Sequence, residues 1–125
     1  AVADFKMKNA EPQKIKKDQS KNMNLSLEKN EDILKHVSDN NPDLKVVGFA
    51  AETENMIDNA RKKLSSKNLN LIVANDVSDS SIGFDSNTNE VTLITEKEEL
   101  KIPRTSKEKV ARKIVQFISK NILND

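Results

Sequence analysis

Residue types that can bind a nucleotide occur at separate places in this chain of 125 residues. Asp4 carries a carboxylate that can accept hydrogen bonds from ribose hydroxyls, and Phe49 carries a ring that can stack on a base. Lys63 and Lys67 lie four residues apart, so on a helix they share one face and can neutralise phosphates as point charges. This set of groups suits a nucleoside triphosphate.

No glycine-rich phosphate loop accompanies these residues. The chain contains two glycines, and neither a P-loop nor a dinucleotide-binding fingerprint can be built from them. Residues 5–21 are rich in lysine, including Lys14, Lys16 and Lys17, and contain few apolar side chains. We expect this segment to be a flexible loop that leaves the sheet just after Asp4.

Each candidate residue also has a purely structural explanation. Asp4 could cap the loop that follows it, and Phe49 could belong to the core. The lysines of residues 14–17 could form a solvated charge run. Lys63 and Lys67 could simply complement the dipole at the C-terminus of a helix. The residue types alone therefore leave both explanations open.

Nucleophilic catalysis and metal binding have little support in the sequence. His36 is the one histidine, and no ligand cluster or nucleophile accompanies it. Ser78, Ser80 and Ser81 have no base that could activate them. We therefore name no metal ligands and no catalytic serine.

Strands that alternate with helices must position the candidate residues. The apolar run that reaches Phe49 stops in small residues at Ala50 and Ala51, and a helical pattern follows at once. This is typical of a buried parallel strand that leads into a helix, and the small side chains let a ligand approach the backbone. The expected elements are a strand end at 1–4, a half-exposed strand at 23–28, a short helix from 30–32, a strand at 44–50, a helix at 54–67, a strand at 69–74, a hairpin at 89–95 and 100–102, and a last helix after a capping box at Thr105 and Glu108.

This order predicts an α/β fold of the Rossmann-like type. We expect a mostly parallel sheet with helices on both faces and an antiparallel hairpin at one edge. Four segments should then end at the same edge of the sheet, where open α/β sheets bind their ligands. These segments end at Asp4, at the turn of residues 30–32, at Phe49 with the small residues that follow it, and at Asn75-Asp76.

Composition excludes several classes of partner. The chain has 21 basic and 20 acidic residues, so no global field favours nucleic acid or an anionic membrane. Nothing resembles a signal peptide or a membrane span, and cysteine is absent, which fits a cytoplasmic protein. Because Ala1–Asp4 has the pattern of a strand end, we expect the chain to be a fragment of a larger domain.

Four motifs occur in order along the chain. They are Ala1-Val2-Ala3-Asp4, Lys14-Ile15-Lys16-Lys17, Val47-Gly48-Phe49-Ala50-Ala51-Glu52-Thr53 and Ala74-Asn75-Asp76-Val77. These motifs resemble those of the bacterial phosphopantothenate–cysteine ligases, members of the DNA/pantothenate metabolism flavoprotein family. The resemblance extends over nearly the whole chain and is weakest after Thr88. It implies that residues 1–125 are the C-terminal part of a single CTP-binding ligase domain, with residues 5–21 as a flexible flap.

The resemblance implies a reaction in coenzyme A biosynthesis. Such ligases use CTP and Mg²⁺ to convert 4′-phosphopantothenate into an acyl-cytidylate, and cysteine then displaces CMP. The full-length enzymes are expected to be homodimers. FMN belongs to a decarboxylase half that this chain lacks, and the glycine-rich phosphate segment and the asparagine that handles the acyl intermediate would lie before Ala1.

The resemblance also implies a role for each motif residue. Lys14, on the flap, would contact the nucleotide and assist activation, and Asp4 would hold the ribose of CTP. Phe49 would line the cytidine pocket. The remaining implied contacts are backbone groups of the turn Glu31, Asp32, Ile33 and Leu34, and the side chains of Lys63 and Lys67.

Two other functions remain open at this point. The same fold could serve as a non-catalytic nucleotide-binding or regulatory module. Alternatively, residues 6–21 could bind single-stranded nucleic acid, which would give a steep salt dependence. The absence of aromatic residues between the lysines argues against nucleic acid.

Overall fold

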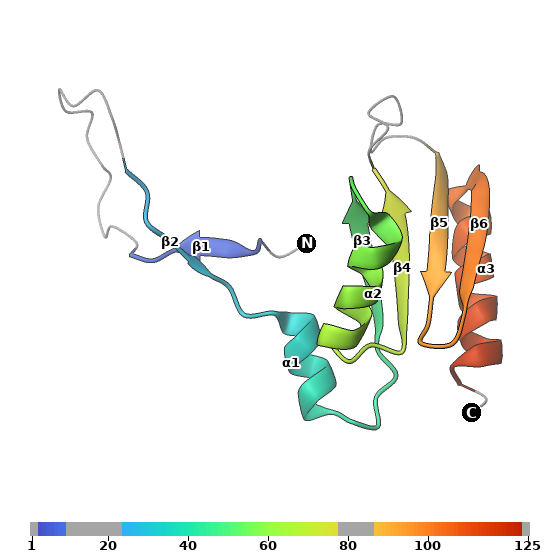
Figure 1. Ribbon diagram of the computed structural model, residues 1–125, viewed down its shortest axis with the longest axis horizontal. Coiled ribbons are helices and arrows are strands. Elements are labelled where there is room, and N and C mark those ends of the chain that lie inside the picture. Colours follow the sequence, from blue (N-terminus) through green and yellow to red (C-terminus); the bar gives the residue numbers. More distant parts are fainter. Residues whose placement is uncertain (1–2, 10–23, 78–86, 124–125) are drawn as a thin grey trace. The chain divides into compact units, whose positions relative to one another are not determined.

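The computed structural model describes residues 3–9, 24–77 and 87–123 (Figure 1). The chain divides into an N-terminal unit, Ala1–Ile33, and a C-terminal unit, Leu34–Asp125. Its elements are β1 (Phe5–Met7), β2 (Leu27–Lys29), α1 (Ile33–Asn40), β3 (Val47–Glu52), α2 (Met56–Ser66), β4 (Leu71–Asp76), β5 (Thr88–Ile94), β6 (Glu99–Ser106) and α3 (Lys107–Asn121).

The N-terminal unit contains a short antiparallel strand pair. Phe5 pairs with Lys29 and Met7 with Leu27, and the ammonium of Lys6 lies 3.3 Å from the Glu28 carboxylate. The expectation of a loop from residue 5 onward is therefore wrong at β1, because three residues are too few to show a period in the sequence. Of the strand expected at 23–28, residue 23 lies outside the described residues, 24–26 are not in a strand, and β2 begins at Leu27. Lys14, Lys16 and Lys17 lie outside the described residues.

The C-terminal unit is built on a four-stranded sheet in the order β3-β4-β5-β6. β3 and β4 are parallel, whereas β4 with β5 and β5 with β6 are antiparallel. The α/β class and the hairpin at one edge are confirmed. Within the described residues, the parallel part of the sheet is the β3–β4 pair.

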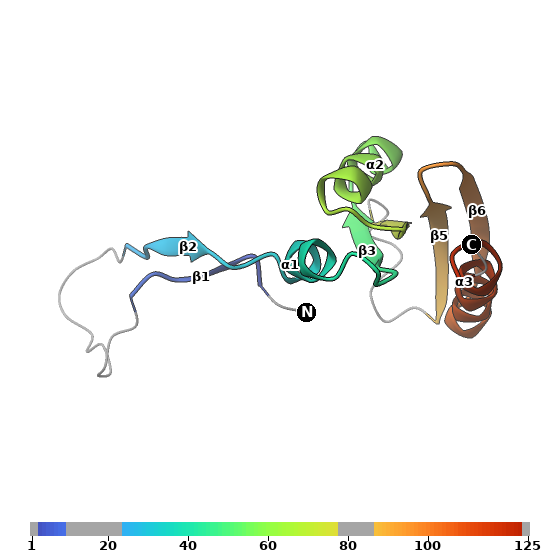
Figure 2. The same ribbon diagram turned by 90° about the horizontal axis from the view of Figure 1, so that it is seen from below.

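Two apolar clusters cover the two faces of this sheet, with α2 on one face and α3 on the other (Figure 2). Successive strand residues point to opposite faces, so each strand contributes to both clusters. The α2 cluster contains Ala50, Ala60, Leu64, Ile72, Ala74 and Ile94. The α3 cluster contains Leu71, Val73, Val91, Leu93, Ile102, Val110, Ile114, Phe117 and Ile122.

The start of α3 differs from the expected capping box. β6 extends through Ser106, and Thr105 lies inside the strand, where it pairs with Asn89, one residue before the position that caps the helix. Ser106 is the N-cap instead, and its hydroxyl accepts a hydrogen bond from the Lys109 N–H at 3.3 Å. The register of the hairpin thus moves the helix start by one residue.

The element boundaries around the expected site also shift. β3 and β4 run on through Glu52 and Asp76, so residues expected to follow the strands lie within them. α1 begins at Ile33, after the 30–32 turn. Both strands are longer than expected because their last residues pair with each other. The pattern of apolar residues gives no sign of this pairing.

Gly48 limits the size of side chain at the centre of β3. An added Cβ would lie 2.7 Å from Leu69 Cδ1 and 3.1 Å from Leu34 Cδ2, so both leucines would have to move. We expect Gly48→Val to lower the free energy of unfolding by about 1–3 kcal/mol. Ala51→Val, at an exposed position of the same strand, should change it by less than about 0.5 kcal/mol. Urea denaturation of both variants provides the measurement, and equal effects would contradict the packing argument.

The β5–β6 hairpin should give a small pH dependence of stability. A hydrogen bond from Lys101, whose Nζ lies 2.9 Å from Oε1, holds the pKa of Glu90 below its usual value. This carboxylate stabilises the fold above the unfolded-chain pKa of about 4.3, and the contribution is lost as pH falls through the lower folded pKa.

We therefore expect Glu90→Gln to lower the free energy of unfolding by about 0.2–1 kcal/mol at pH 7, since the pair is exposed. The difference from the parent chain should vanish at strongly acidic pH. Glu96→Gln, at an exposed position in the turn of the same hairpin, serves as the control. If the difference in free energy of unfolding between Glu90→Gln and the parent chain grew on acidification, the Glu90–Lys101 ion pair would not be the cause of the pH dependence.

Candidate functional site

The carboxyl ends of β3 and β4 lie side by side, as the sequence predicts. Ala51 is in register with Asn75, and Glu52 with Asp76. The chain then enters α2 through Asn55, the N-cap, which has a left-handed backbone (φ 46°, ψ 44°). The first turn of a helix presents N–H groups that have no partner within the helix, so this edge offers donors as well as carboxylates.

Lys63 is held at this edge by an acid that the sequence did not single out. Its ammonium donates to Oε1 of Glu52 at 2.5 Å, and the Asn59 amide lies 3.5 Å from Oε2. The Glu52 side chain is only 11% exposed, whereas that of Lys63 is 43% exposed. Lys63 therefore neutralises a largely buried carboxylate, and its other two N–H groups can donate to a ligand. In the sequence, the only available indication of a role for Glu52 was its position as an acid at the end of a buried strand.

Lys67 lies in a different environment. It is the C-cap of α2, and its carbonyl accepts a hydrogen bond from the Ser38 hydroxyl at 2.5 Å. Because α2 returns the chain to the start of the parallel strand β4, its C-terminus lies toward the amino ends of the strands. The structure therefore places Lys63, but not the backbone of Lys67, beside the carboxyl ends.

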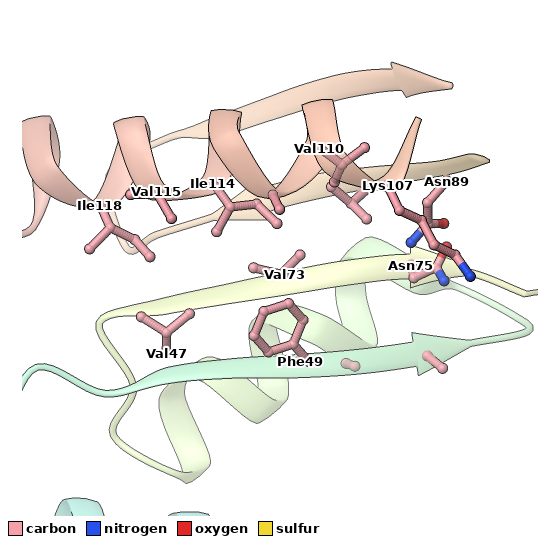
Figure 3. Close-up of a pocket in the computed structure, with 14 residues that line it drawn as sticks. Val47, Phe49, Val73, Asn75, Asn89, Lys107, Val110, Ile114, Val115 and Ile118 are labelled. Atoms are coloured by element: carbon pink, nitrogen blue, oxygen red, sulfur yellow. The ribbon is translucent and has the colours of Figure 1, made fainter. Parts of the chain in front are cut away.

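Phe49 lies on an open apolar groove and is not a core residue of this unit. Its side chain is 72% exposed and faces a cavity of about 660 Å³ between β3 and α3 (Figure 3). Valine and isoleucine side chains line most of the wall. They are Val47, Val73, Val91, Val110, Ile114, Val115 and Ile118.

Three polar side chains close one end of this groove. Asn75 from β4, Asn89 from β5 and Lys107 from the start of α3 gather there (Figure 3). Two amides and an ammonium can donate hydrogen bonds to oxygen atoms of a ligand. Asn89 and Lys107 were missed from the sequence, because only the pairing of β5 with β4 brings them next to Asn75.

The other predicted residues gather in the N-terminal unit. The Asn30 N–H donates to the carbonyl of Asp4 at 2.8 Å, and its amide donates to the carbonyl of Ala3 at 2.6 Å. The predicted approach of Asp4 to the 30–32 turn is therefore found within this unit. Glu31 and Asp32 continue that turn up to the start of α1.

Leu34 belongs to the C-terminal unit. Its side chain packs beside Gly48 of β3. The predicted site residues thus occur in two sets, one in each unit. The first set is Asp4, Glu31, Asp32 and Ile33, and the second is Leu34, Phe49, Lys63 and Lys67.

The described part of the chain contains no group of three or more histidine, cysteine, aspartate or glutamate side chains arranged to hold a metal ion. In the same residues, no helix combines the length and apolarity needed to cross a bilayer.

Sequence comparison matches residues 1–122 to the family described as "DNA/pantothenate metabolism flavoprotein C-terminal domain". The Coenzyme A biosynthesis bifunctional protein CoaBC of Bacillus subtilis is 43% identical over 120 residues, which are 95% of this chain and 29% of that protein. CoaBC of Vibrio cholerae is 40% identical over 122 residues, which are 94% of this chain and 30% of that protein. The chain thus spans under a third of these relatives.

Solved structures give a consistent result. The C-terminal domain of a CoaBC protein superposes with a TM-score of 0.67 and 36% identity, covering 81% of this chain and 46% of that one. The DNA/pantothenate metabolism flavoprotein of Streptococcus pneumoniae gives a TM-score of 0.68 at 21% identity, covering 82% and 44%. The second likeness concerns the fold alone.

The Glu52–Lys63 pair provides a test of this edge. Lys63→Met would leave a largely buried carboxylate without its cation, so we expect the free energy of unfolding to fall by about 1 kcal/mol or more. Lys62→Met, at an exposed position of the same helix, should change it by less than about 0.5 kcal/mol.

Adding Glu52→Gln to Lys63→Met should recover part of the loss, because the remaining group is then neutral. Chemical denaturation of the four proteins in this double-mutant cycle measures the coupling. Additive effects of the two substitutions would show that the pair does not stabilise the edge.

Proposed function

Because the chain belongs to the DNA/pantothenate metabolism flavoprotein C-terminal domain family, we propose that it is the CTP-binding part of a phosphopantothenate–cysteine ligase in coenzyme A biosynthesis. The family match over residues 1–122 carries this proposal. The geometry supports it, since the Phe49 ring, the Lys107 ammonium and the amides of Asn75 and Asn89 line one groove of the C-terminal unit. Lys63 lies at the end of β3 on the α2 side, paired with Glu52.

The proposed reaction has two steps. The carboxylate of 4′-phosphopantothenate attacks the α-phosphorus of CTP, forming an acyl-cytidylate and releasing pyrophosphate. The amine of cysteine then attacks the acyl carbon, so that a C–N bond forms and CMP leaves. Lysine side chains assist the first step by stabilising the charge that develops on the pyrophosphate.

Each predicted residue receives a role under this proposal. Phe49 lies against cytosine, Asp4 holds the ribose, and Lys14 contacts the nucleotide from the flap. The 31–34 turn contributes backbone groups, and Lys63 and Lys67 contribute positive charge. Mg²⁺ would be held mainly by the nucleotide phosphates, as is usual for this ion. The complete enzyme would act as a homodimer.

This chain would supply only part of the site. It corresponds to 46% of the solved CoaBC C-terminal domain. Under the proposal, the phosphate-binding segment and the residue that handles the acyl intermediate come from the remainder. We therefore expect the chain alone to bind CTP weakly and to form no acyl-cytidylate.

Isothermal titration tests the nucleotide site. CTP should bind this chain more tightly than ATP does, and Lys14→Gln should weaken CTP binding by about tenfold, the usual effect of losing one charge-assisted contact. Lys97→Gln, in the turn of the β5–β6 hairpin, should leave the affinity unchanged. Equal affinity for both nucleotides together with no effect of Lys14→Gln would overturn the site.

An activity assay separates a ligase from a regulatory module. We define the CoaBC chimera as the Bacillus subtilis protein in which the 120 matching residues are replaced by this chain. The chimera should release pyrophosphate only when CTP, 4′-phosphopantothenate and Mg²⁺ are all present, and should form the amide when cysteine is added. A chimera that folds and binds CTP without this turnover would instead favour the non-catalytic nucleotide-binding module.

A further inference from the structure

The last residue of β3, Glu52, has a fixed main chain and a side chain that points toward α2. Ala50 belongs to the α2 cluster, and Glu52, two residues later on the strand, faces the same side of the sheet. Glu52 is in register with Asp76, and its carbonyl accepts a hydrogen bond from the Val77 N–H at 2.9 Å. The carboxylate therefore starts from a backbone that cannot move freely.

The carboxylate itself has a neighbour at each oxygen. Oε1 accepts a hydrogen bond from the Lys63 ammonium at 2.5 Å, and Oε2 lies 3.5 Å from the amide nitrogen of Asn59. The same amide donates to the Glu54 carbonyl at 2.9 Å, so the segment between β3 and α2 orients it. Because the Glu52 side chain is only 11% exposed, the carboxylate is a rigid acceptor for Lys63.

This contact orders the end of the Lys63 side chain. A lysine on the surface of a helix normally samples many rotamers, and it loses that freedom when it binds a ligand. The Lys63 side chain is 43% exposed, and one of its three N–H groups is used by Glu52. The ammonium is therefore held in place before a ligand arrives, which lowers the cost of binding one.

A second ion pair on α2 lacks these features. Arg61 pairs with Glu99 of β6, and the side chains are 42% and 37% exposed. Exposed pairs of this kind hold their side chains weakly, because water competes for both groups. The burial of the acid thus distinguishes the Glu52–Lys63 pair from its neighbour on the same helix.

We propose that Glu52 is a positioning residue of the nucleotide site. It holds the Lys63 ammonium where that group meets the phosphates of the nucleotide, and it acts on the ligand through Lys63. The inference rests on the proposed function, in which Lys63 supplies positive charge to the nucleotide.

The sign of the effect on affinity separates positioning from simple electrostatics. A carboxylate near a polyphosphate repels it, so removing a carboxylate that acted only through its field would tighten binding. Removing a carboxylate that positions Lys63 weakens binding, because the released side chain must then be ordered by the ligand.

Nuclear magnetic resonance of this chain tests the ordering without any nucleotide. The ¹³C order parameter of the Lys63 ε-methylene should exceed that of Lys62, which is exposed on the same helix. Glu52→Ala should lower it to the Lys62 level, and Glu52→Gln should give an intermediate value because its amide oxygen can still accept a hydrogen bond. Glu99→Gln, which removes the partner of Arg61, is the matched control and should leave Lys63 unchanged.

Kinetics of the CoaBC chimera test the consequence for the ligand. Glu52→Ala should raise the KM for CTP by about three- to tenfold, the usual effect of ordering one long side chain on binding. Glu52→Gln should raise it less, and Glu99→Gln should leave it unchanged. In the Lys63→Met background, Glu52→Ala should cause no further rise, because the side chain on which it acts is gone. A loss caused by damage to the fold would persist in that background.

Three results would overturn the positioning role. They are a Lys63 side chain as mobile as that of Lys62 in the parent chain, a KM for CTP that Glu52→Ala leaves unchanged or lowers, and an equal rise in the Lys63→Met background. A chimera without CTP-dependent turnover would instead refute the proposed function. The same substitutions would then be compared in this chain with sodium tripolyphosphate, which has a phosphate chain without a nucleoside. Unchanged or tighter binding by Glu52→Ala would overturn the positioning role there, and weaker binding would support it.

Discussion

The parallel pairing of β3 with β4 is the constraint on which the rest of the C-terminal unit depends. A parallel pair cannot be closed by a tight turn, so the chain must cross over the sheet through α2. That crossover puts the start of α2 and both strand ends at one edge, and it brings Lys63 within reach of Glu52. The polar edge is thus a consequence of the backbone topology.

The same pairing leaves the unit unequally covered. α2 spans β3 and β4 on one face, whereas α3 covers mainly β5 and β6 on the other. Phe49 consequently faces a groove in place of a helix. A modest apolar content of 35% is compatible with this arrangement, because the two clusters are small and one of them is open at its side.

Local periodicity was enough to predict most of the elements of the C-terminal unit. The apolar positions of α3, the buried run of β4 and the hairpin all have clear periods. The register of the strands was not predicted, and it includes an irregularity between Asn89 and Val91. Contacts distant in sequence were not accessible in this way. The Glu52–Lys63 pair, the gathering of Asn89 and Lys107 beside Asn75, and the β1–β2 pair depend on which strands become neighbours. The family resemblance supplied roles for residues that pattern alone left ambiguous, as it did for Phe49.

The left-handed backbone at Asn55 restricts which residues can occur between β3 and α2. Asparagine, aspartate and glycine tolerate that conformation, whereas β-branched residues are strained in it. Related proteins should therefore preserve a short polar residue or glycine at this point even where their ligands differ. An invariant residue at this position would therefore reflect the backbone conformation of the turn. It should not be taken as evidence that the residue recognises substrate.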